Sequence, residues 1–231
     1  AAQVGYLIGG VAPSAVAVAR RNPFPEPSLL GSPGLSSLHA ARLLLGLDLR
    51  SLQRFAGDVS VEALQIADRG IGRAAEGPFS AALAAVEGIR LLHRYLTSGD
   101  VAQLDEARSR LDEAMQATFA PHDTDSRWVA ALLADFGTAF AATSIASLMP
   151  SGSSLVQMAF TLGDPPVVLL WPPQAEMLQL EPSPFDPEVQ RVVLSLPTSA
   201  GKTLMAQLLI CHHLAESEGD VCFVAPTHSL C

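Results

Sequence analysis

The chain has 231 residues, of which 49% are hydrophobic and 16% are charged. This composition supplies a core and excludes a disordered chain. The net charge of -9 provides no overall basic face, so any contact with nucleic acid has to be local. The chain begins without Met and stops at Cys231 inside an unfinished pattern. We therefore expect it to be a fragment of a longer polypeptide.

Two apolar stretches resemble membrane segments only in part. Residues 4–19 lack a preceding basic segment and contain Pro13, which argues against a signal peptide. Residues 129–149 are rich in Ala and carry Asp135, which favours a buried helix over a bilayer span. The three cysteines form no disulfide framework and fit a reducing compartment. We predict a cytoplasmic protein that does not contact a membrane.

The first 160 residues are predicted to be mainly α-helical. Residues 22–37 are rich in Pro and Gly and should form a loop. Apolar residues at helical spacing and Ser residues suited to capping predict helices over His39–Leu49, Ser60 to about Arg73, a segment that includes Ala85–Leu96, a segment that includes Leu104–Met115, and Ser126–Leu148. A turn at 98–100 separates the third helix from the fourth. We assign this region no chemistry and expect an accessory module that docks a protein partner.

The pattern changes after about residue 160. A short helix is predicted over Ala175–Leu180, followed by a Pro-rich loop over 181–190. The order of a βαβ unit then predicts a strand over Val192–Leu196, a loop over Pro197–Gly201, a helix from Lys202 to about Glu216, and a strand over Val221–Val224. The predicted fold class is a mainly α region, 1–160, followed by the start of an incomplete α/β P-loop domain, 161–231.

The loop of this unit has the residue types that bind a triphosphate. Backbone N–H groups of Thr198, Ser199 and Ala200 would face the phosphates at the N-terminus of the next helix. Gly201 would let the backbone approach them closely. The residues that follow, Lys202 and Thr203, would contact the β- and γ-phosphates of ATP and bind Mg²⁺ through the Thr hydroxyl.

Two features decide how specific this loop is. The strict phosphate-loop pattern has Gly where this chain has Leu196, and a bare Gly-Lys-Thr also occurs in ordinary strand-to-helix turns. Lys202, however, is the single Lys in a chain with 13 Arg. A compact ammonium fits a tight phosphate pocket in a way that a guanidinium does not. The predicted strand, helix and second strand around it favour the nucleotide interpretation.

These segments resemble superfamily 2 helicases. Leu194–Thr203 (LSLPTSAGKT) is similar to their motif I, where the first Gly of the loop is commonly replaced. Its wording resembles the DExH branch that contains the helicase domain of DNA polymerase theta. Val221–Cys231 (VCFVAPTHSLC) resembles motif Ia of the same DEAD/DEAH-box enzymes, in which Pro226 and Thr227 would lie beside the nucleic-acid backbone. His228 stands where these enzymes usually carry a basic residue.

A third segment, Pro173-Gln174, lies where these helicases have the Gln of the Q motif. The resemblance implies that Gln174 binds the adenine edge, because an amide offers both the donor and the acceptor that adenine N7 and N6 require. The alternative is a surface Gln that follows a Pro turn.

The resemblance covers about residues 171–231 and implies a RecA-like fold, ATP hydrolysis and movement along single-stranded DNA or RNA in the full-length protein. Lys202 and Thr203 would be the catalytic residues that this chain supplies. No Asp-Glu-x-His follows Lys202 in the sequence, and the arginine finger of a second lobe would also lie elsewhere. We therefore expect the chain alone to bind ATP weakly and not to hydrolyse it.

Two other hypotheses remain open. One is a different P-loop NTPase, such as a small-molecule kinase or a signalling ATPase, which would have a substrate lid in place of a second RecA-like lobe. The other is a helical interaction module whose phosphate loop is vestigial. The second hypothesis predicts that replacing Lys202 leaves cellular function intact.

Overall fold

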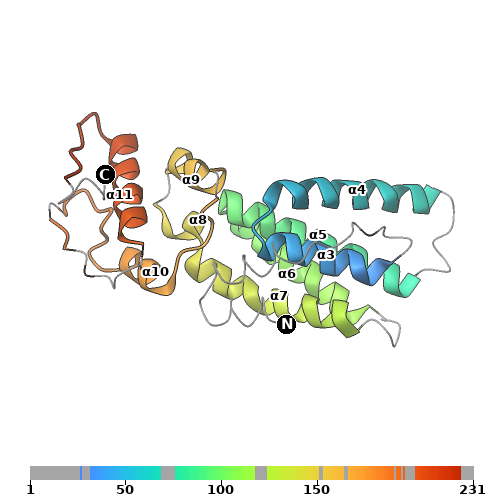
Figure 1. The fold of residues 1–231 in the computed structure, drawn as a ribbon. Helices are drawn as coiled ribbons and strands as arrows, with labels where there is room; N and C mark the ends of the chain where they lie inside the picture. The colour runs from blue at the N-terminus through green and yellow to red at the C-terminus, as the bar shows by residue number, and fades with distance from the viewer. Residues whose placement is uncertain are drawn as a thin grey trace.

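The structure is a computed structural model of the chain. It describes residue 27 and residues 32–68, 76–117, 124–150, 153–163, 166–189, 191–193, 195 and 201–224. This part is mainly helical, as predicted for the first 160 residues. Its helices are α3 (Pro33–Leu45), α4 (Leu49–Asp68), α5 (Glu76–Ser98), α6 (Val101–Gln116), α7 (Thr124–Thr143), α8 (Ile145–Leu148), α9 (Ser154–Thr161), α10 (Pro172–Leu178) and α11 (Lys202–Glu216). The molecule is elongated, with α3–α7 at one end and α11 at the other (Figure 1).

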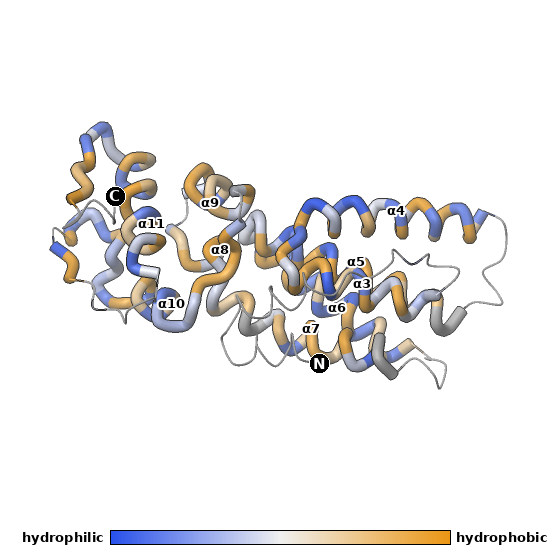
Figure 2. Tube along the Cα trace, in the orientation of Figure 1, coloured by the Kyte–Doolittle hydropathy of each residue, from blue (hydrophilic) through white to orange (hydrophobic). Residues whose placement is uncertain are grey.

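Helices α3–α7 pack around one apolar cluster, which we call the bundle core. Its centre is α5, from which Ile89, Leu92 and Tyr95 are almost fully buried. Hydrophobic and hydrophilic residues alternate along α4 at helical spacing (Figure 2), so this helix buries one face and exposes the other. Burial of these apolar faces is the main favourable contribution to the bundle.

The connection between α5 and α6 follows the prediction. Gly99 adopts a left-handed conformation with a φ of 74° and its N–H donates to the Tyr95 carbonyl, as in helix C-terminal caps. The Asp100 carboxylate accepts a hydrogen bond of 3.0 Å from the N–H of Ala102 and caps α6. Leu104 and Leu111 then point into the bundle core, as their spacing predicts.

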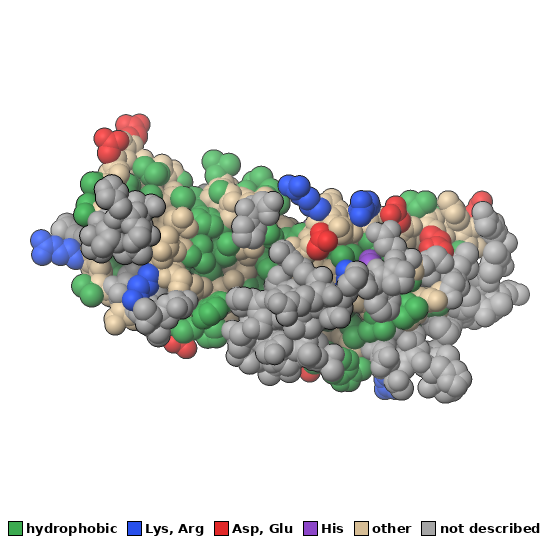
Figure 3. Space-filling model, viewed as in Figure 1, with side chains coloured by type: hydrophobic (Ala, Val, Ile, Leu, Met, Phe, Trp, Pro, Cys, Tyr) green, Lys and Arg blue, Asp and Glu red, His purple; other side chains and the backbone are tan. Residues whose placement is uncertain are grey.

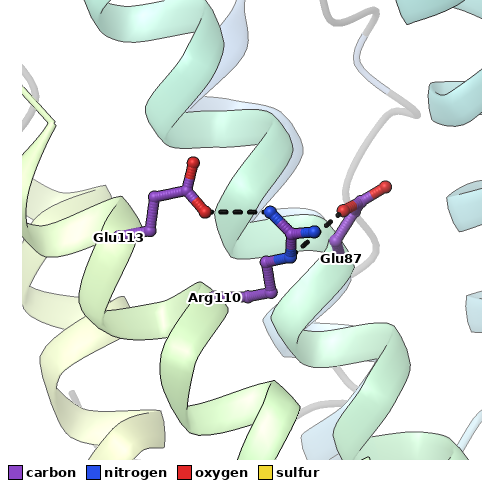
Figure 4. A network of polar contacts seen from close by, with 3 residues as sticks. All are labelled: Glu87, Arg110 and Glu113. Carbon is purple, nitrogen blue, oxygen red and sulfur yellow. Dashed lines mark hydrogen bonds and ion pairs between the residues drawn. The ribbon is translucent and has the colours of Figure 1, made fainter.

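An exposed ion network also joins these two helices (Figure 4). The Arg110 guanidinium lies 3.0 Å from Glu113 on α6 and 3.8 Å from Glu87 on α5. The hydrogen bond to Glu113, and then the charges of Glu113 and Glu87, raise the pKa of Arg110. Because all three side chains are solvated, such pairs contribute about 0–1 kcal/mol. The close packing of α5 on α6 therefore depends on their apolar faces.

Two helix starts differ from the predictions. The first helix begins at Pro33, inside the stretch predicted as loop. Ser60 was expected to cap a helix, but it lies inside α4 and its hydroxyl donates to the Ala56 carbonyl at 2.8 Å. A Ser in a helix interior satisfies its hydroxyl in this way, so its presence alone does not mark an N-terminus. The predicted end at Arg73 lies outside the described residues.

The helix predicted over Ser126–Leu148 is interrupted at Ser144. Ser144 pairs with Leu169 in an isolated antiparallel bridge, in which Ile145 N–H donates to Val168 and Leu170 N–H donates to Thr143. The Ser144 hydroxyl then accepts a hydrogen bond from the N–H of Ser147, which caps α8. The interruption thus depends on a segment more than twenty residues away, which helical periodicity does not reveal.

Helices α8–α11 share a second apolar cluster, the end core. Its buried members are Ile145, Met149, Val156, Leu170, Ala175, Met177, Leu178, Phe185, Met205 and Leu208. The chain therefore passes from the bundle core to the end core near Ser144, whereas the sequence predicted a domain boundary at residue 160. The boundary itself stays a prediction.

The two predicted strands are wrong for the residues that the structure describes. Residues 191–193, 195 and 221–224 have no strand conformation and are exposed, with Val193 at 95% and Val224 at 82%. A parallel strand forms only when neighbours accept and donate its backbone hydrogen bonds, and no residue in the described ranges pairs with these segments in this way. Of the predicted βαβ unit, the described part contains the helix alone.

Within the described ranges, no helix is both long and apolar enough to cross a bilayer.

The approach of α5 to α6 predicts opposite effects for two glycines. A Cβ at Gly88 would lie 2.8 Å from Cγ of Leu111 and 3.2 Å from the Ala107 carbonyl oxygen. We expect Gly88→Ala to lower the free energy of unfolding by about 1–3 kcal/mol. Gly57 in α4 has nothing within 4 Å, so Gly57→Ala should raise it by about 0.5–1 kcal/mol. Urea denaturation followed by circular dichroism checks both; equal effects would contradict the close approach.

His93 predicts a pH dependence of stability. Burial, and then the charge of Arg94, lower the pKa of this imidazole from its ordinary 6.5. The unfolded chain therefore binds a proton more readily than the folded chain. The contribution of the neutral His93 imidazole to the free energy of unfolding is fully present above pH 6.5. It is lost as the pH falls through 6.5 towards the lower pKa of the folded state. We expect His93→Gln to flatten the fall in Tm between about pH 7.5 and 5.5. Gly57→Ala, which changes no titratable group, is the control and should leave the slope unchanged.

Candidate functional site

Helix α11 is fixed at its base by the end core. Met205 and Leu208 are fully buried in that cluster, and Leu204, Leu209 and Cys211 pack against it. The helix has the bounds that the sequence predicts, Lys202–Glu216. Its first turn therefore projects from a packed support, which is the kind of support that a precise binding site needs.

The chain enters α11 through Gly201 in a left-handed conformation, with a φ of 74° and a ψ of 39°. Its carbonyl accepts the first hydrogen bond of the helix, from Met205 N–H at 3.2 Å. Residues with a side chain adopt this conformation at a cost, so the position favours Gly. Gly201 thus sets the direction in which the chain enters α11.

Lys202 and Thr203 are exposed in the first turn of α11. Neither side chain has a hydrogen bond or an ion pair with any other described residue. The first turn contains no acidic residue, although the N-terminus of a helix carries a partial positive charge that favours anions and disfavours cations. The Lys202 ammonium and the N–H groups of this turn thus concentrate positive charge at one point, where an anion would be stabilised.

Gln174 lies next to this turn although it is 27 positions earlier in the chain. It is the third residue of α10, only 4% exposed, and its Oε1 accepts a hydrogen bond of 2.9 Å from the N–H of Trp171. Its Nε2 occupies the space where a Cβ of Gly201 would lie. The structure thus brings together four of the predicted site residues: Gln174, Gly201, Lys202 and Thr203.

The remaining predicted site residues lie outside the described part of the chain. They are Thr198, Ser199 and Ala200 of the phosphate loop, and Pro226, Thr227 and His228 of the segment that resembles motif Ia. Their roles in binding ATP and nucleic acid stay predictions.

The C-terminal part of α11 is held by contacts that the sequence did not indicate. Nδ1 of His212 and the hydroxyl of Ser153, the residue before α9, are hydrogen-bonded at 2.9 Å. The His212 ring also lies edge-on to Phe185, with ring centroids 4.8 Å apart. These partners are 59 and 27 residues away, so no local pattern could have shown them.

Metal and cofactor binding stay predictions for this site. Thr203 is exposed, and its hydroxyl stays the predicted ligand of Mg²⁺. No three His, Cys, Asp or Glu side chains gather as a metal site within the described ranges. On the face drawn in Figure 3, Lys and Arg side chains are scattered along the molecule.

A cavity of about 570 Å³ lies elsewhere, between the α3–α4 turn and the end of α9. It is lined by Arg42, Asp48 and Arg50 with Leu43 and Leu162, and it does not include any residue of α11. The candidate site at α11 is therefore an exposed helix terminus, separate from this cavity.

No family model, curated protein or solved structure matches the chain.

The contact between α10 and α11 predicts that Gly201 does not tolerate a side chain. Gly201→Ala would strain the left-handed backbone, at about 1–2 kcal/mol, and would also collide with Nε2 of Gln174. We expect a clear loss of stability in thermal or urea unfolding. Gly219→Ala is the matched control, because its nearest neighbour would lie 3.5 Å away, and it should change stability by less than about 0.5 kcal/mol. If both variants unfold alike, Gly201 is not constrained as described.

Proposed function

We propose that the chain is the ATP-binding front part of a nucleic-acid-dependent ATPase of the helicase type. One observation carries the proposal: the first turn of α11 combines Gly201, the exposed Lys202 and the exposed Thr203 without any acidic side chain. Lys202 would contact the β- and γ-phosphates, and Thr203 would bind Mg²⁺. The amides of Thr198, Ser199 and Ala200 would complete the phosphate loop.

Electrostatics supports this reading of the first turn. A Lys at the first position of a helix lies at the positive end of the helix dipole, where it is disfavoured by about 0.3–1 kcal/mol. Lys202 has no carboxylate in its own turn to offset this cost. A bound triphosphate would convert the same arrangement into a favourable one, because it accepts hydrogen bonds from the ammonium and from the free N–H groups together.

The proposed fold of this part is RecA-like, which goes beyond the helices that are described. The apolar side chains of Val193, Phe223 and Val224 are exposed at 95%, 54% and 82%. Exposed Val and Phe side chains are what the strands of a buried parallel sheet would present without their neighbours. The proposal therefore includes sheet neighbours that cover both segments in the full-length protein.

Hydrolysis and movement along a strand belong to the full-length protein in this proposal. Phosphoryl transfer also needs an acidic box and an arginine finger, and no Asp-Glu-x-His follows Lys202 in the sequence. The contact of Pro226, Thr227 and His228 with single-stranded DNA or RNA is proposed from the resemblance alone.

A second candidate function is an interaction module, and α9 favours it. Leu155, Met158 and Leu162 are exposed at 76%, 49% and 59% and follow one another at helical spacing. An apolar stripe of this kind on a surface helix is typical of protein contacts. The two functions are compatible, because the stripe and the first turn of α11 share no residue.

The proposal predicts that Lys202→Ala weakens ATP binding. Loss of a charge-assisted contact of about 1.5–3 kcal/mol corresponds to about 10- to 100-fold in the dissociation constant. The 231-residue chain would be titrated with a fluorescent ATP analogue and Mg²⁺. Arg191→Ala, another exposed cation, is the matched control and should bind as the unaltered chain does.

The single Lys offers an independent readout on the unaltered chain. An amine-reactive ester can label Lys202 and the α-amino group only, and mass spectrometry separates the two products. MgATP should slow the labelling of Lys202 and leave the α-amino group, an internal control, unaffected. Equal labelling rates with and without MgATP, together with unchanged binding by Lys202→Ala, would reject the nucleotide site and leave the interaction module.

A further inference from the structure

We infer that Gln174 is a positioning residue for Gly201 and the start of α11 and does not read the nucleotide base, so that this side chain does not distinguish ATP from GTP. The inference rests on the proposed function for its nucleotide. It deepens that proposal, because it assigns Gln174 a different role from the one that the resemblance implies.

The first step is the accessibility of the amide. Reading adenine requires the donor and the acceptor of one amide to face the base edge together. Gln174 is only 4% exposed, and its Oε1 already accepts the 2.9 Å hydrogen bond from Trp171 N–H. This bond satisfies the backbone N–H of the residue that precedes α10, as a Gln at the third position of a helix does in a capping box. The acceptor end of the amide is thus directed into its own helix.

The second step is the position of the other end of the amide. Nε2 points away from α10 and lies against Gly201, in the space left by the missing side chain. Gly201 is the residue whose left-handed conformation sets the direction in which the chain enters α11. A side chain that fills this space limits the movement of Gly201 towards α10.

The third step is that both helices are anchored in the end core. Ala175 and Met177 of α10 are buried there, as are Met205 and Leu208 of α11. Gln174 therefore joins two supported elements, and its removal would loosen the start of α11 without unpacking its base. Packed supports of this kind hold a site in its productive geometry.

The consequence for the ligand concerns its phosphate end. A residue that fixes the start of α11 affects the amides and the ammonium that contact the phosphates. ATP and GTP carry the same triphosphate, so replacing Gln174 should weaken the binding of both nucleotides by the same factor. A base reader would instead affect ATP alone, because guanine presents a different edge.

The first measurement does not require a nucleotide. Hydrogen exchange of the 231-residue chain would be compared for the unaltered protein, Gln174→Ala and Gln179→Ala. Gln179 is exposed at the end of the same helix, so it is the matched control. We expect faster exchange at the start of α11, including the Met205 amide that is bonded to Gly201, in Gln174→Ala only. Peptides of α6 should exchange at one rate in all three proteins. Unchanged exchange at the start of α11 would overturn the positioning role whether or not the chain binds nucleotide.

The second measurement is the affinity for fluorescent ATP and GTP analogues with Mg²⁺. We expect Gln174→Ala to weaken both by about tenfold, with the ratio of the two dissociation constants unchanged. Gln174→Glu keeps the acceptor for Trp171 N–H and the length of the side chain, so it also serves if the Ala variant unfolds. Its carboxylate would lie beside Gly201 at the start of α11 and should weaken the binding of both analogues at least as much as Ala does.

The outcomes separate the two proposals. A loss confined to the ATP analogue would identify Gln174 as the base reader and overturn the inference. Equal affinity of all variants for both analogues would overturn it as well. If the unaltered chain binds neither analogue, the proposed function fails, and the exchange measurement alone decides whether Gln174 positions α11.

Discussion

The contact of Gln174 with Gly201 is the constraint on which the candidate site depends. Two helices that are 27 residues apart meet where one lacks a side chain and the other inserts an amide. The amide is held by Trp171 N–H and the glycine by its left-handed backbone. Because each partner is fixed within its own helix, the start of α11 has one direction relative to α10. The exposed Lys202 and Thr203 are placed in space by this contact.

The arrangement divides α11 into a fixed base and an open end. Met205 and Leu208 anchor the first turns in the end core, and His212 ties the last turns to Ser153. At the N-terminal end of the helix, directly after Gly201, Lys202 and Thr203 are exposed polar residues. Rigid support beneath a solvated terminus is the usual plan for binding sites, since a loop without such support would lose its geometry. The bundle of α3–α7 contributes to this plan indirectly, through the α7–α8 interruption that starts the end core.

How far the sequence predicts the structure depends on the range of each signal. The bounds of α11 and the turn at Gly99 are correct because helix periodicity and a glycine cap act over a few residues. The interruption at Ser144 was missed because it depends on backbone partners near Leu169. The described residues of the strands predicted over 192–196 and 221–224 have no strand conformation for the same reason, since apolar composition cannot supply the neighbours that a sheet needs. Within the candidate site, residue types and their order were predictable, but the burial of Gln174 was not.

The position of the single Lys can be interpreted physically only when the sequence and the fold are considered together. The chain has 13 Arg and one Lys. This Lys lies at the start of a helix, where a positive charge is disfavoured. The neighbouring Gly201 adopts a conformation that only Gly adopts without strain, and a buried amide is committed to holding it. The charge of the Lys and the left-handed backbone both depart from what the stability of a helix terminus would favour. Departures that gather at one point, on otherwise well-packed elements, are expected where a ligand offsets their cost. An anion with several oxygens is the one ligand class that would stabilise the ammonium, the free N–H groups and the glycine-directed backbone together.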